Sequence, residues 1–118
     1  LESSSAASDV YKRQDYNMFK VLEELIKTIR ERKNSSEHES YTKKLLMDNN
    51  LCREKVMEEI NELIDALNKK KKEVHEAADA IYHLLVLLEA NDVKIEDVLG
   101  ELKKRQGVSG LVEKANRQ

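Results

Sequence analysis

Residues 51–90 decide the fold, and they read LCREKVMEEI NELIDALNKK KKEVHEAADA IYHLLVLLEA. The first half of this stretch has apolar residues at helical spacing, namely Val56, Ile60, Leu63, Ile64 and Leu67. This spacing predicts a helix over residues 51–67, ended by Asn68 and the lysine run 69–72. A second helix is predicted over residues 73–90. Because so short a turn joins the two helices, we expect them to pack antiparallel.

The predicted helix over residues 73–90 is apolar on nearly every side toward its end. One side carries Val74, Ala77, Ala78, Ile81, Leu84, Leu85 and Leu88. Val86 and Leu87 lie on other sides. A helix on the surface of a monomer keeps a polar face, so this helix is predicted to lie in a subunit interface or at the centre of the fold. We therefore expect a homodimer.

Three further helices are predicted outside this stretch. Residues 18–33 carry an apolar stripe of Val21, Leu22, Leu25, Ile26 and Ile29. Ser40 caps a short helix over residues 41–47, and Asp48, Asn49 and Asn50 favour a turn after it. The last helix spans residues 95–105 and ends in a basic turn, which suits the negative end of its dipole. The sequence thus predicts an all-α bundle of four to five helices, completed by dimerisation.

Composition supports a helical protein and excludes several classes of partner. The 118 residues fit one domain, with 37% charged residues, 4% aromatic residues and no proline. All glycines lie at or after Gly100, which argues against an all-β fold. The net charge of −2 gives no pull toward nucleic acid or membrane surfaces. The lone Cys52 and the lack of a long apolar stretch favour a protein of the reducing cytoplasm.

The two ends of the chain are predicted to lie outside the folded domain. Residues 4–14, SSAASDVYKRQ, resemble the in-frame translation of a sequencing adapter, and a genuine disordered tail is the alternative. We therefore expect residues 1–14 to be non-native or disordered, the domain to cover residues 15–105, and a tail to cover residues 106–118. Met18 is a candidate initiator, although residues 15–17 could belong to a lost upstream domain.

Acidic pairs recur at helical spacing in both central helices. Glu59 and Glu62 lie three residues apart in one helix, and Glu76 and Asp79 do so in the next. Antiparallel packing would bring these four carboxylates together. Such convergence is unfavourable unless a cation neutralises it, and all-oxygen ligands suit Mg²⁺ or Mn²⁺ better than zinc.

The acids of the first central helix could also serve solubility alone. For Glu58, Glu59 and Glu62 the alternative to a metal site is a solvated helix face with ordinary salt bridges. A di-iron carboxylate bundle is a poorer alternative, because it needs Glu-x-x-His pairs. Neither His75 nor His83 has a glutamate three residues before it.

Some polar residues receive a weak role or none. The lysines of residues 69–72 could bind phosphate but are more typical of a solvated turn. His83 is either a substrate ligand or a helix histidine hydrogen-bonded to a carboxylate. His38, His75 and Cys52 are assigned no role.

Three segments in the same order and spacing resemble phosphoribosyl-ATP pyrophosphohydrolases of histidine biosynthesis. They are residues 40–46 (SYTKKLL), 55–62 (KVMEEINE) and 76–83 (EAADAIYH). The paired acidic motif alone marks the broader MazG-like superfamily of all-α NTP pyrophosphohydrolases. The resemblance covers about residues 18–105 and extends to the tail. Met57 and Lys94 depart from it, because the family often has glycine and serine at these places.

The resemblance implies Mg²⁺-dependent hydrolysis of the α-β phosphoanhydride of phosphoribosyl-ATP to phosphoribosyl-AMP and pyrophosphate. It implies that Glu59, Glu62, Glu76 and Asp79 are metal ligands. Glu58 would be a further ligand or the base that orients the attacking water. The resemblance implies that Glu59 is a catalytic residue as well as a ligand. By the same resemblance, the substrate would be bound by Tyr41, Thr42, Lys44, Lys55 and His83.

Two other functions compete with this one. A house-cleaning MazG-like (d)NTP pyrophosphohydrolase would use the same metal chemistry on another base. A non-enzymatic helical interaction protein would need its acids only for solubility. The resemblance also raises the prospect that the chain is fused to, or acts with, a phosphoribosyl-AMP cyclohydrolase.

Overall fold

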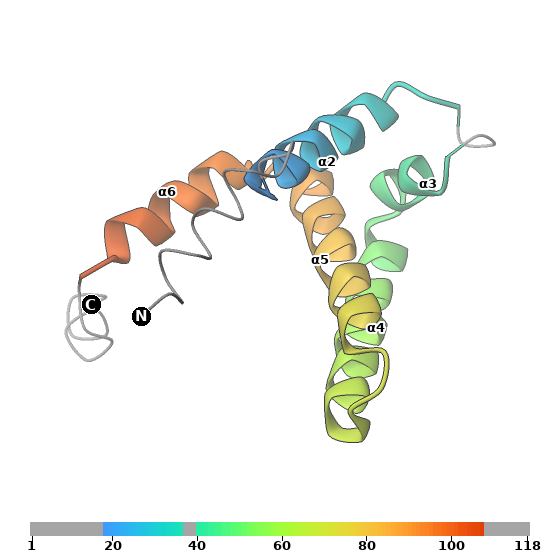
Figure 1. The fold of residues 1–118 in the computed structure, drawn as a ribbon. Helices are drawn as coiled ribbons and strands as arrows, with labels where there is room; N and C mark the ends of the chain where they lie inside the picture. The colour runs from blue at the N-terminus through green and yellow to red at the C-terminus, as the bar shows by residue number, and fades with distance from the viewer. Residues whose placement is uncertain (1–17, 37–39, 108–118) are drawn as a thin grey trace. The chain divides into compact units, whose positions relative to one another are not determined.

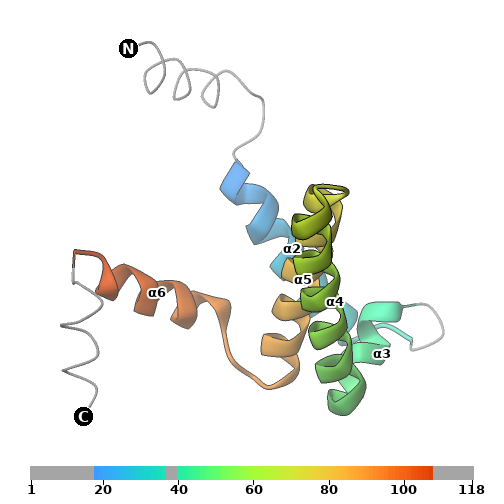
Figure 2. The same ribbon diagram turned by 90° about the horizontal axis from the view of Figure 1, so that it is seen from below.

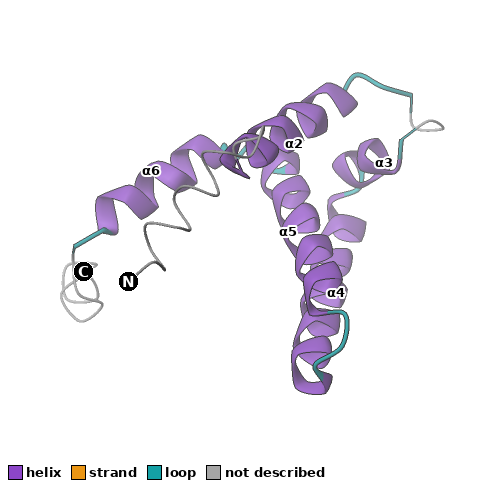
Figure 3. Cartoon of the chain, in the orientation of Figure 1, coloured by secondary structure: helices purple, strands orange, loops and turns teal. Residues whose placement is uncertain are grey.

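The computed structural model describes residues 18–36 and 40–107, and every regular element in these ranges is a helix (Figure 1, Figure 3). The helices are α2 (Met18–Arg32), α3 (Tyr41–Met47), α4 (Asn49–Lys69), α5 (Glu73–Ala90) and α6 (Ile95–Arg105). The prediction of an all-α chain is confirmed. The expectations for residues 1–14 and for most of the 106–118 tail fall outside the described residues. The chain divides after Lys44 into two compact units, which are described separately.

The first unit contains α2 and the start of α3. Ile29 is the buried member of the α2 stripe, whereas Val21, expected on the same stripe, is exposed. Ser40 begins α3 as predicted, because its Oγ accepts a hydrogen bond from the Lys43 N–H at 3.1 Å. The Lys43 ammonium also donates to the carbonyl of Lys33, which ties the start of α3 to the end of α2.

The predicted turn over residues 48–50 is wrong for its last two residues, because α4 already begins at Asn49. Asp48 alone lies outside the helix, and its carboxylate accepts a hydrogen bond from the Leu51 N–H at 3.1 Å. One aspartate is enough to cap the helix, so Asn49 and Asn50 are helical. At the other end α4 continues to Lys69, two residues beyond the prediction. Lys70 then adopts a left-handed conformation with φ of 56° and closes the helix by donating to the carbonyl of Ala66.

In the second unit, α4 and α5 form an antiparallel helical hairpin, seen side by side in Figures 1 and 2. The buried residues of this unit include Cys52, Val56 and Ala66 on α4, and Ala80, His83, Leu85 and Val86 on α5. Val86, expected away from the main apolar side, is fully buried. The predicted buried face of α4 is partly wrong, because Ile60, Ile64 and Leu67 are exposed, Ile64 by 51%. The buried face lies about a quarter turn away and carries the acidic residue Glu59.

Asn91 makes two contacts at the end of α5, whereas α6 begins without a side-chain cap. The Asn91 amide donates to the carbonyl of Leu87 at 2.8 Å and to Oδ1 of Asn49 at 3.0 Å, so it ties the end of α5 to the start of α4. Lys94 precedes α6 and makes no side-chain cap, as its departure from the family pattern suggested. Within the described part of the chain, no helix is both long and apolar enough to cross a membrane.

Candidate metal centre

The α4–α5 hairpin brings together acids that are distant in sequence. Glu59 and Glu62 lie one turn apart on α4, and Glu76 lies in the first turn of α5. One carboxylate oxygen from each of these three residues lies within 4.8 Å of the other two. The short turn between the helices produces this convergence, because it places the first turns of α5 beside the second half of α4.

Two of these carboxylates have an oxygen without a protein partner. Oε2 of Glu59 and Oε2 of Glu76 are buried and accept no hydrogen bond from the described residues. Buried oxygens of this kind are costly, since a carboxylate loses its hydration and gains nothing in return. A cation bound by the carboxylates of Glu59, Glu62 and Glu76 would satisfy these oxygens.

The surroundings of Glu59 favour its protonated form. Burial raises the pKa of the Glu59 carboxyl above its ordinary value, and the neighbouring carboxylates of Glu62 and Asp79 add to this effect. Glu62 also raises the pKa through a hydrogen bond, whereas His83 opposes the shift. The site therefore holds more negative charge than its protein surroundings neutralise.

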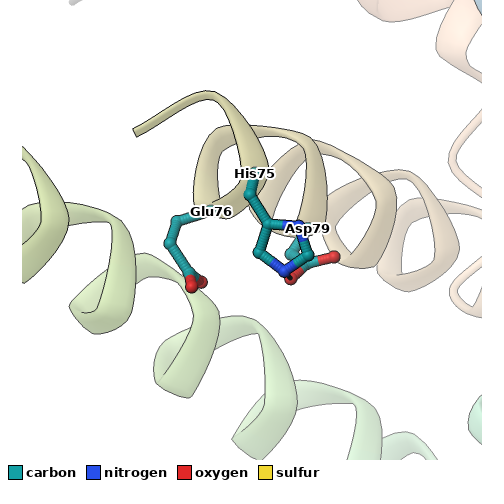
Figure 4. A group of neighbouring side chains, drawn as sticks. All are labelled: His75, Glu76 and Asp79. Carbon is teal, nitrogen blue, oxygen red and sulfur yellow. Dashed lines mark ion pairs between the residues drawn. The ribbon is translucent and has the colours of Figure 1, made fainter. Parts of the chain in front are cut away.

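A second donor group shares Glu76 with the first. His75, Glu76 and Asp79 each place one ligand atom within 4.8 Å of the others. Nε2 of His75 lies 3.4 Å from Oδ2 of Asp79, one helical turn further along α5. Figure 4 shows the three side chains leaving one side of α5. His75 was predicted to have no role, although its four-residue spacing from Asp79 places both side chains on one face of the helix.

His83 is buried, with 6% exposure, and lies one turn after Asp79. Its Nδ1 is 2.8 Å from the backbone carbonyl of Asp79. A carbonyl can only accept, so Nδ1 carries a proton and donates it. The Tyr82 ring packs edge-on against the imidazole with ring centres 5.0 Å apart. His83 is thus bonded to the backbone of α5, and at 6% exposure it offers little surface to a substrate.

Glu58 and Lys55 are placed differently from the other predicted site residues. The Lys55 ammonium lies 3.1 Å from Oε2 of Glu58, and the side chain of Glu58 is half exposed. Glu58 belongs to neither donor group. The structure therefore distinguishes two adjacent glutamates, since Glu59 joins the acids between the helices and Glu58 forms an ion pair on the outside of α4.

The remaining predicted substrate ligands belong to the first compact unit. Tyr41 and Lys44 are exposed on α3, and Thr42 between them is half-buried. Their side chains are accessible in part, and the structure does not relate them to the acids of the second unit.

Known proteins are similar to this chain over the region that contains the acidic hairpin. The family described as Phosphoribosyl-ATP pyrophosphohydrolase matches residues 22–106. The Phosphoribosyl-ATP pyrophosphatase of Ruegeria pomeroyi is 46% identical over 100 residues, covering 82% of this chain and 95% of that protein. The protein of that name from Neisseria meningitidis serogroup B is 44% identical over 100 residues, covering 82% and 94% respectively. The chain belongs to the phosphoribosyl-ATP pyrophosphohydrolase family.

Proposed function

We propose that this protein hydrolyses the α-β phosphoanhydride of phosphoribosyl-ATP, giving phosphoribosyl-AMP and pyrophosphate, as the second step of histidine biosynthesis. The observation that carries the proposal is the meeting of Glu59, Glu62 and Glu76 between α4 and α5, in a chain of this family. Two buried oxygens there lack a protein partner within the described part of the chain. A polyphosphate substrate with its cation would complete such a site.

Mg²⁺ fits the donor set that these residues offer. Glu59, Glu62, Glu76 and Asp79 supply carboxylate oxygens only, which are the ligands a small hard cation prefers. When bound, Mg²⁺ would neutralise phosphate charge and acidify a coordinated water. Mn²⁺ is expected to replace it, because it accepts the same oxygen ligands.

The protein side chains have separate tasks in this proposal. Glu59 is the best-placed group to orient the attacking water, because it is partly buried among the acids and its Oε2 accepts no hydrogen bond from the described residues. Glu58 would take that role, or become a further ligand, only after its ion pair with Lys55 opens.

Basic and polar residues are proposed to bind the phosphoribosyl and phosphate groups. Lys55 lies one turn before Glu59 on α4, where its charge can meet a phosphate. Tyr41, Thr42 and Lys44 are the candidates from α3. His83 supports the site from the buried side of α5 through its bond to Asp79. Loss of Lys44 or Lys55 should raise KM more than it lowers kcat.

The test is pyrophosphate release from phosphoribosyl-ATP, compared with ATP and dCTP, in the presence of Mg²⁺ or of a chelator. Wild type is compared with Glu59→Gln, which keeps the size of the side chain but removes its charge. Glu54→Gln is the matched control, since Glu54 is exposed on the same helix and lies in neither donor group.

The outcomes separate the candidate functions. Metal-dependent and phosphoribosyl-selective turnover that is lost in Glu59→Gln and kept in Glu54→Gln supports the proposal. Turnover of ordinary nucleotides alone would instead assign the house-cleaning activity. A folded protein with no turnover on any substrate would favour the alternative that this chain is a non-enzymatic interaction protein.

We further propose that the protein is a homodimer through a second apolar face of the α4–α5 hairpin. Large side chains on this face are 37–60% exposed, namely Met57, Ile60, Ile64, Leu67, Ile81 and Leu84. Large exposed apolar side chains in this number are typical of an interface, and α5 has apolar residues on opposite sides, as a helix between two layers does. A second copy of the same hairpin offers a matching surface through two-fold symmetry.

Sedimentation velocity tests this assembly. Ile64→Glu places a charge in the centre of the face and should convert the dimer to a monomer. Gln106→Glu adds the same charge at the end of α6 and should leave the dimer intact. A wild-type monomer at concentrations above 100 μM would refute the proposed assembly, since an obligate interface holds together far below about 1 μM.

The cellular setting proposed for this activity is the cytoplasm, which suits a lone unpaired cysteine. A phosphoribosyl-AMP cyclohydrolase is the proposed functional partner, since it consumes the product of this reaction. Sequence upstream of Asp15 would test whether the two activities share one chain.

A further inference from the structure

Beside the carboxylates of Glu76 and Asp79 lies an exposed nitrogen donor, the imidazole of His75. His75 lies in the first turn of α5, next to Glu76 and one turn before Asp79. Its imidazole points along the helix so that Nε2 is 3.4 Å from Oδ2 of Asp79 (Figure 4). The ligand atoms of His75, Glu76 and Asp79 all lie within 4.8 Å of one another.

We propose that His75 Nε2 is a metal ligand, and that His75, Glu76 and Asp79 bind a divalent transition-metal ion such as Mn²⁺ at a position adjacent to the all-oxygen group. This inference rests on the metal site of the proposed function and extends it to a second, chemically different cation position. Glu76 belongs to both groups, so its carboxylate would bridge the two positions.

The geometry is close to what one shared ion requires. Ligand atoms bound about 2.0–2.2 Å from one ion are at most about 4.4 Å apart. The 4.8 Å limit on the three donor atoms therefore leaves a few tenths of an ångström for the side chains to close. His75 can make this movement, because its side chain is 69% exposed.

The chemistry of the donors separates the two positions. Glu59, Glu62 and Glu76 offer oxygen only, which suits Mg²⁺. An imidazole nitrogen is a softer ligand that raises the affinity for Mn²⁺, Co²⁺ or Zn²⁺ over Mg²⁺. The alternative is a plain ion pair between protonated His75 and Asp79. Such an exposed pair is worth at most about 1 kcal/mol and would bind no ion through nitrogen.

Pulsed electron paramagnetic resonance of Mn²⁺ bound to the full chain tests this directly, because it detects the nuclear spin of a coordinated nitrogen. Wild type is compared with His75→Gln. The double variant His75→Gln with Lys103→His is the matched control, since it keeps the number of histidines. Lys103 lies on α6, which follows the opposite end of α5 from His75. Mn²⁺ and Mg²⁺ affinities are measured by calorimetry on the same samples.

We expect nitrogen coupling in the wild type and none in either variant. The affinity of Mn²⁺ for the position that contains His75 should fall about tenfold or more in both variants, as for the loss of a metal-site group. The Mg²⁺ affinity of the all-oxygen position should change less than about twofold. Nitrogen coupling that survives in His75→Gln, or that is missing from the wild type, would overturn the assignment. These readouts use no substrate, so a failure to turn over phosphoribosyl-ATP would leave them unaffected.

Discussion

Glu59→Gln should stabilise the metal-free protein, although it should abolish activity. The carboxylates of Glu59, Glu62 and Glu76 have oxygens within 4.8 Å of one another. Two unit charges at such a distance repel by about 1 kcal/mol in water and by about 4 kcal/mol at an effective dielectric constant of 20. Since Glu59 is half-buried, we expect the removed repulsion to be near the lower end of this range. Glu59→Gln should therefore raise the free energy of unfolding by about 1–2 kcal/mol at neutral pH.

The pH dependence of this gain follows from the raised pKa of Glu59, caused first by burial and then by its acidic neighbours. In the pH range between the ordinary and the raised value, the folded state holds more protons than the unfolded state. Stability therefore falls as pH rises through this range. Glutamine does not titrate. The gain in the free energy of unfolding from Glu59→Gln should therefore be absent well below the ordinary glutamate pKa and should grow as the pH rises above it.

Urea unfolding followed by circular dichroism, in chelator and at several pH values, measures this effect. Glu54→Gln is the control and should change the free energy by less than about 0.5 kcal/mol. Adding Mg²⁺ at about 100 times its dissociation constant should stabilise the wild type by about 2.7 kcal/mol and Glu59→Gln by much less. A metal-free Glu59→Gln that is less stable than the wild type at neutral pH would refute the reasoning, because Glu59 would then be favourably placed without a cation.

Three further predictions concern parts of the fold away from the candidate metal centre. Burial raises the pKa of the Cys52 thiol, so iodoacetamide should label it slowly in the folded protein at pH 7 and rapidly in urea, as mass spectrometry would show. Equal labelling in both states would contradict its burial. Asp48→Ala should lower the free energy of unfolding by about 1 kcal/mol through loss of the α4 cap, whereas Asp48→Ser should restore most of it in urea titrations. Lys94→Ser should raise the free energy of unfolding by about 0.5–1 kcal/mol by adding a cap to α6. An unchanged urea midpoint would show that this helix end gains nothing from a cap.

Much of the fold was predictable because local interactions determine it. The bounds of α5 and α6 are as predicted, since the lysine turn and the Asn91–Asp92 pair interrupt the apolar spacing on either side. The cap at Ser40 was also predictable, because a serine before a helix accepts the N–H three residues later. The start of α4 was not predictable. Each residue from Asp48 to Asn50 favours a turn, and only one of them is needed to begin a helix.

The acidic pairs of the candidate site were predictable from spacing, but their individual environments were not. Three-residue spacing places Glu59 with Glu62, and Glu76 with Asp79, whatever surrounds them. Which of two adjacent glutamates turns inward depends on the neighbouring helix, and α5 packs on the side of Glu59. The pairing of His75 with Asp79 was predictable, because both lie on α5 at four-residue spacing and share a helix face.

By itself, the sequence determined that the chain is helical, where its central turn lies, and that acids recur on both helices beside that turn. These features depend on contacts between residues a few positions apart. The tertiary structure decided which face of α4 is buried, leaving Ile60, Ile64 and Leu67 exposed, and which carboxylate oxygens are removed from water. Burial depends on the surface that a neighbouring helix presents, and α4 has apolar residues in more than one direction, so its own spacing could not distinguish them.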